Sequence, residues 1–134
     1  MKAIYKILVC LGVLAASHSA AAQTDGSEVF VPISKYITQG NAESLSAWFA
    51  DNLEISVAGS LTSSSKSQAK QIVKSFFDSH TPRSFEISHV AGRSNMKYAL
   101  GTLNAGGETY NVTIFVSCKN DDYRIQQLKI EKIQ

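Results

Sequence analysis

Residues 65–77 read SKSQAKQIVKSFF, and this stretch decides the fold. Its apolar residues recur at i, i+3, i+4, i+7 and i+8, the spacing of one face of an α-helix, and they are Ala69, Ile72, Val73, Phe76 and Phe77. Ser65 and Gln68 stand at the positions of a capping box, and Pro82 follows the last apolar residue. The stretch therefore predicts a long helix that ends before Pro82 and packs one face onto something flat.

The residues before this helix predict two short helices and one strand. The first helix starts at Glu28, ends at Gly40, and carries the apolar residues Phe30, Ile33, Tyr36 and Ile37. The second follows at once from a cap at Asn41, and its expected apolar face is Leu45, Trp48 and Phe49. Residues 53–57 alternate as a half-buried strand does, and residues 60–64 predict a polar loop.

The residues after the long helix predict four strands. Short turn-forming segments separate them, so the strands are expected to be antiparallel neighbours, and they are Ser84–Ala91, Met96–Leu103, Tyr110–Cys118 and Tyr123–Ile133. The last strand changes parity, because Tyr123 and Ile125 are odd whereas Leu128 and Ile130 are even. A β-bulge near residues 126–127 reconciles the two halves and predicts a curled sheet.

The first 22 residues have the pattern of a secretory signal peptide. Basic Lys2 and Lys6 precede the apolar run 7–16, and the small residues 20–22 precede Gln23, the expected mature N-terminus. The sequence thus predicts a signal peptide over 1–22, a disordered lead-in over 23–27 and a single α+β domain over 28–134. Since only one cysteine would remain, a disulfide-free bacterial periplasm or envelope is the expected location.

Charge and composition argue against several classes of partner. Processing would lower the 13 Lys and Arg residues to 11, equal to the 11 Asp and Glu residues, so we expect no nucleic-acid partner. The ten-residue apolar run is shorter than the roughly 20 residues that span a bilayer, so no integral membrane segment is expected after processing. No Cys or His spacing is typical of a metal site, and we expect neither a metal nor another cofactor.

The order of these elements resembles a known fold. The stretches that carry the resemblance are residues 65–77, PISKYITQGNAESLSAWFADNLEISVAG (32–59), SHVAGRS (88–94), YALGTL (98–103) and QQLKIE (126–131). They resemble the nuclear transport factor 2-like superfamily of conical α+β folds, and more closely a family of small secreted bacterial proteins called domain of unknown function 4783. The resemblance implies N-terminal helices and one long helix packed in a highly curved, mostly antiparallel sheet.

Five side chains are candidates for lining a pocket in the cone. His89 has the strand parity of Phe85 and Ile87, and Tyr98 and Tyr110 are expected to project inward; the full set is His89, Tyr98, Tyr110, Trp48 and Tyr36. Enzymes of the resembling fold use a carboxylate and a tyrosine inside the cone. No Asp or Glu stands at an inward position of the four late strands, so we expect no catalytic residues.

We interpret the sequence as a secreted, non-enzymatic binding module for a small apolar ligand or a protein partner. The open sheet face carries Asn111, Thr113, Phe115 and Ser117, a composition suited to a homodimer interface. The alternative is an isomerase- or hydrolase-type enzyme that uses His89 with Tyr98 or Tyr110 in the cone.

Overall fold

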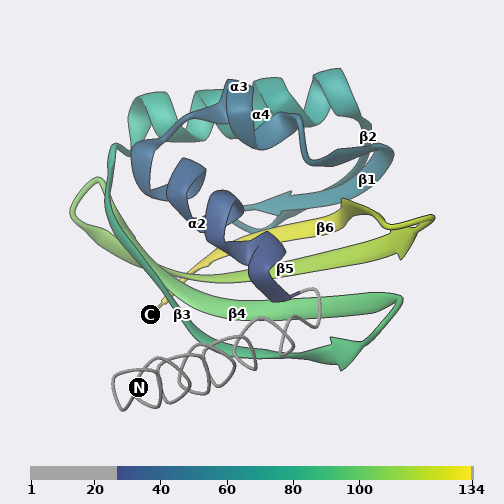
Figure 1. The fold of residues 1–134 in the computed structure, drawn as a ribbon. Helices are drawn as coiled ribbons and strands as arrows, with labels where there is room; N and C mark the ends of the chain where they lie inside the picture. Colours follow the sequence, from purple (N-terminus) through teal and green to yellow (C-terminus); the bar gives the residue numbers. More distant parts are fainter. Residues whose placement is uncertain (1–26, 134) are drawn as a thin grey trace, which may run out of the picture.

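A computed structural model describes residues 27–133 (Figure 1). The helices are η1 (Ser27–Val29, a 3-10 turn), α2 (Phe30–Gln39), α3 (Ala42–Ser46) and α4 (Lys66–Ser79). The strands are β1 (Phe49–Val57), β2 (Ser60–Ser65), β3 (Pro82–Arg93), β4 (Met96–Ala105), β5 (Glu108–Lys119) and β6 (Asp122–Lys132). The expected signal peptide and the lead-in up to residue 26 lie outside the described residues, whereas Ser27 already begins η1.

The six strands form one sheet in the order β2-β1-β6-β5-β4-β3. Every neighbouring pair is antiparallel except β1 and β6, which are parallel. After the β1–β2 hairpin the chain passes through α4 to the far edge of the sheet and returns strand by strand until β6 meets β1. The prediction of an α+β fold with a mostly antiparallel sheet is confirmed.

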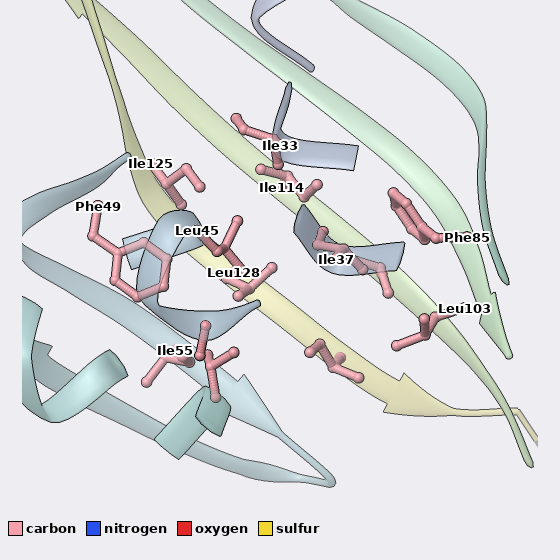
Figure 2. Close-up of a cluster of buried hydrophobic side chains, with 14 of the residues drawn as sticks. Ile33, Ile37, Leu45, Phe49, Ile55, Phe85, Leu103, Ile114, Ile125 and Leu128 are labelled. Atoms are coloured by element: carbon pink, nitrogen blue, oxygen red, sulfur yellow. The ribbon is translucent and has the colours of Figure 1, made fainter. Parts of the chain in front are cut away.

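The core lies on the concave side of this sheet, where α2, α3 and α4 pack (Figure 1). Figure 2 shows side chains from helices and strands converging there, and among them are Ile33, Ile37, Leu45, Phe49, Ile55, Phe85, Leu103, Ile114, Ile125 and Leu128, all buried. We call this side the inner face and the opposite side of the sheet the outer face. Side chains fill the inner face, which is where a ligand cavity in the cone was expected.

Helix α4 has the predicted cap and the predicted buried stripe. The Ser65 hydroxyl accepts from the Gln68 backbone N–H, and the Gln68 side chain accepts from the Ser65 N–H, each at 3.3 Å. Its buried residues are Ala69, Val73, Phe76 and Phe77, and Ile72 is partly buried. The helix ends at Ser79, and Pro82 is the first residue of β3, where its missing N–H costs little because β3 is an edge strand.

Two local predictions upstream of α4 are wrong. The second helix stops at Ser46, because Phe49 pairs with Ile125 and the Trp48 carbonyl accepts a 2.7 Å hydrogen bond from the Ile125 N–H, which requires extended chain. The expected polar loop at 60–64 is strand β2, joined to β1 by a turn in which Ala58 and Gly59 both have positive φ. An edge strand needs backbone partners rather than apolar alternation, so its serines gave no strand signal.

The predicted bulge in the last strand is confirmed. Val116 pairs with Ile125 while the adjacent Phe115 pairs with Gln127, so Gln126 is the extra residue. The bulge lets both Ile125 and Leu128 reach the inner face, where each is almost completely buried.

We predict that Phe76→Ala lowers the free energy of unfolding by about 3 to 5 kcal/mol, because Phe76 is buried between α4 and the sheet and its loss leaves a cavity. Lys70→Ala is the control on the same helix. It removes one partly exposed ion pair with Glu43 and should cost less than about 1 kcal/mol. Urea denaturation of both variants checks this, and equal midpoints would contradict the assigned buried face.

Candidate functional site

A β-bulge in β3 decides which way its side chains point. Ile87 pairs with Gly101 and His89 pairs with the next residue, Leu100, so Ser88 is an extra residue in the strand. The Ser88 hydroxyl donates to the Leu100 carbonyl at 3.2 Å. Because a bulge reverses the parity of the strand beyond it, His89 lies on the outer face and not beside Phe85 and Ile87 as predicted.

Tyr98 also lies on the outer face, contrary to the prediction. In β4 the odd residues are buried and the even ones are not, since Ala99 and Leu103 face the core. The Tyr98 ring stands between His89 and Phe115, with ring centroids 5.9 Å and 5.5 Å away. We call His89, Tyr98 and Phe115 the aromatic row; it crosses β3, β4 and β5.

Apolar side chains extend the aromatic row across the outer face. Leu100 is 38% exposed and Met96 is 52% exposed, and exposed apolar residues that gather in a patch often mark an interaction site. A cleft of about 510 Å³ borders the row, and its lining includes Met96, Phe115, Gln126, Gln127 and Glu54. Asn111, Thr113 and Ser117 lie on this same face, as their alternation predicted.

Tyr110 is on the inner face, as predicted, but it is packed into the core. Its ring meets Phe76 edge-on with centroids 5.1 Å apart, and His80 lies 6.1 Å away in the same orientation. Burial raises the pKa of the Tyr110 phenol above its usual 10.0, the Glu108 carboxylate raises it further, and the Lys132 ammonium opposes them. Tyr110 and His89 are therefore on opposite faces of the sheet and cannot act on one substrate atom.

Trp48 and Tyr36 lie away from the aromatic row. Trp48 is half-buried and borders a cleft of about 360 Å³ with Pro32 and Tyr123. Tyr36 is partly buried against the core. The five candidate residues thus do not form one pocket, and contact of any of them with a ligand stays a prediction.

The bulge at Ser88 is what sequence reasoning missed. Within β3 the apolar residues change parity from Phe85 and Ile87 to Val90, but Ala91 continues the odd alternation and hides the extra residue. A second signal was Gly101 in the neighbouring strand, since glycine inside a strand often indicates a bulge or a close approach. A Cβ on Gly101 would lie 2.7 Å from both the Phe85 ring and the Glu86 carbonyl oxygen.

A family model matches residues 30–131 and is described as Domain of unknown function (DUF4783). The chain belongs to this family. A DUF4783 protein from Bacteroides uniformis has the same fold, with 22% identity, coverage of 77% of this chain and 95% of that one, and a TM-score of 0.74. No protein with a curated description matches the DUF4783 chain in sequence.

Two further structures show how widely the fold of this DUF4783 protein is shared. A cystatin-like domain from Nostoc punctiforme has 13% identity, coverage of 84% and 79%, and a TM-score of 0.67. A design bearing the NTF2 name, for nuclear transport factor 2, has 12% identity, coverage of 78% and 94%, and a TM-score of 0.64. The predicted resemblance to the family and to the conical fold is confirmed, and at these identities the structures show the fold alone.

Residues 27–133 contain neither a cluster of metal-ligating side chains nor a membrane-spanning helix. No three His, Cys, Asp or Glu side chains gather there as a metal site would need. Within the same range no helix combines the length and the apolar character required to cross a bilayer.

We predict that the DUF4783 protein loses stability above pH 10 partly through Tyr110. Because the folded-state pKa is raised, the stabilisation is complete below the unfolded pKa of about 10 and is lost as pH rises toward the folded value. The urea midpoint should therefore decrease less between pH 8 and pH 10.5 in Tyr110→Phe than in the wild type. An equal decrease of the midpoint in both proteins would contradict the raised pKa of Tyr110.

We predict that His89→Gln changes the free energy of unfolding by less than about 0.5 kcal/mol, because His89 is exposed on the outer face. A matched core substitution, Leu103→Gln, should unfold the protein or cost several kcal/mol, since Leu103 is fully buried on the adjacent strand. Thermal melts of the two variants distinguish this placement from the inward one; a large loss in His89→Gln would restore the inward placement.

Proposed function

We propose that this protein is a secreted, non-enzymatic binding module whose outer sheet face docks a second copy of the chain. The aromatic row, with Leu100 and Met96 beside it, is the observation that carries the proposal. Tyrosine and other aromatic side chains are enriched at the centre of protein interfaces, where a few residues contribute most of the binding free energy.

The distribution of charge on the outer face suits contact with itself. In a two-fold dimer the residues near the axis meet their own copies, so charged residues there would repel. The central residues Phe115, Tyr98 and Leu100 are uncharged. The charged outer-face residues lie around them and include Glu54, Glu86, Arg93, Arg124, Lys129 and Glu131. Lys129 and Glu131 also lie within 3.9 Å of each other, which balances part of that rim.

The outer face also has the size that a dimer needs. Strands β3 to β6 have 10 to 12 residues each. At about 3.3 Å per residue and about 4.8 Å between strands, they present on the order of 700 Å². A standard protein interface buries about 800 Å² per partner, so the face is large enough with a modest contribution from its rim.

The placement of His89 favours binding over the enzyme alternative. A general base works within about 3 Å of its proton, usually in a site that excludes water. His89 is exposed, its ring centroid is 5.9 Å from that of Tyr98, and Tyr110 is on the other face. The proposed dimer would use His89 as one end of a contact surface.

The predicted signal peptide supports a location outside the cytoplasm. The order of Lys2 and Lys6, the apolar run 7–16 and the small residues 20–22 is that of secreted precursors. An intact mass of the secreted protein that corresponds to an N-terminus at Gln23 would support this part of the proposal, and a mass that retains residues 1–22 would contradict it.

We predict that Tyr98→Glu weakens the dimer at least about thirtyfold, because two carboxylates then face each other near the axis and a central aromatic anchor is lost. Sedimentation equilibrium between 1 and about 100 μM measures the change. Gln71→Glu is the control, since it adds the same charge on the exposed side of α4. Circular dichroism verifies that both variants fold. A monomeric wild type, or an unchanged dimer in Tyr98→Glu, would contradict self-association.

A further inference from the structure

A second surface lies on the inner side of β3, where α2 crosses the edge of the sheet. A groove of about 610 Å³ runs between them, within the volume range of small-molecule sites. Its lining consists of Ser27, Phe30, Val31, Ser34, Lys35, Thr38 and Gln39 from the helical side and Ile87 and Val90 from β3. None of the five candidate residues from the sequence belongs to it.

Local structure explains why apolar groups are left uncovered here. Phe30, Ile33 and Ile37 form the buried face of α2, so Val31, Ser34, Lys35 and Thr38 share the next face at helical spacing. On the strand side, the bulge at Ser88 brings Val90 to the inner face beside Ile87. Val31 is 69% exposed and Val90 is 38% exposed, so within residues 27–133 the groove keeps an apolar floor that is open to solvent.

The helical wall changes character along its length. Its first turn presents Phe30 and Val31, whereas its later turns present Ser34, Lys35, Thr38 and Gln39. Among the described residues that line the groove, Lys35 is the single charged side chain. No carboxylate of residues 27–133 lies within ion-pair distance of Lys35. The groove therefore offers apolar contact at one end and an ammonium group with hydroxyl and amide neighbours farther along.

We propose that this groove binds an aliphatic monocarboxylate, a free fatty acid of medium chain length, with its carboxylate on Lys35 and its chain along Val31, Ile87 and Val90. The shape fits a chain, because α2 has ten residues and rises about 15 Å along the groove. The charge fits an anion, because Lys35 has no acidic partner in the described structure. This site lies on the opposite face from the aromatic row, so it does not depend on the proposed dimer.

The test is a titration of the secreted wild-type protein with decanoate below its micellar concentration, followed by backbone amide shifts in NMR. We expect saturable shifts confined to residues 27–39 and 87–90. Octanoate should bind about tenfold more weakly, because two fewer methylene groups leave water. Decyltrimethylammonium, which has the same chain and the opposite charge, should bind at least about fivefold more weakly than decanoate.

Two variants and a control separate headgroup recognition from simple adhesion to apolar surface. Lys35→Gln should weaken decanoate about threefold to fivefold. Val31→Glu should weaken it tenfold or more, since a carboxylate four residues before Lys35 pairs with the ammonium and removes an apolar contact. Lys74→Gln removes a cation from the exposed side of α4, where Lys74 is paired with Asp78, and should leave the affinity for decanoate unchanged.

Any of three outcomes would overturn the proposal: absent or scattered amide shifts, equal affinity for decyltrimethylammonium and decanoate, or unchanged decanoate affinity in Lys35→Gln. Tyr98→Glu provides a check of independence. It should bind decanoate as the wild type does even where it fails to dimerise, so loss of one site can be told from loss of the other.

Discussion

The parallel pairing of β6 with β1 is the contact on which the rest of the structure depends. It joins the last strand to the first across most of the chain and aligns Ile55 with Leu128 and Val57 with Ile130. Parallel strands need a crossover, and here α4 and the β3–β5 meander supply it. The pairing fixes the β6 end of the meander to the β1–β2 hairpin, and α4 connects the hairpin to the β3 end at the far edge of the sheet. The helices pack on one face of this sheet, so its apolar face is buried on one side only.

Bulges then decide what each face presents. A strand alternates strictly, so one extra residue moves every later side chain to the opposite face. At Gln126 this keeps Ile125 and Leu128 together in the core. At Ser88 the extra residue places His89 on the outer face and Val90 on the inner one. The same family fold can therefore present different surfaces after a shift of one residue.

The parts of the fold that the sequence predicts are those in which local pattern and burial agree. Helix α4 has both a capping box and an apolar stripe, and the bulge in β6 is visible because Ile125 and Leu128 differ in parity. β2 was not predictable, because its serines are held by backbone bonds to β1. The outward turn of His89 was hidden for a related reason: both faces of β3 beyond Ser88 carry mixed residues, so parity there has no burial signal.

Strand β3 connects the two proposed surfaces through one structural device. His89 and Val90 are adjacent in the chain and point to opposite faces, and both positions follow from the pairing of Ile87 with Gly101 and His89 with Leu100. Gly101 permits that pairing because a Cβ there would collide with the Phe85 ring and the Glu86 carbonyl. β3 is an edge strand, so its hydrogen bonds to β4 alone fix this register. The pairing at this bulge therefore sets which side chains the outer face and the groove each present.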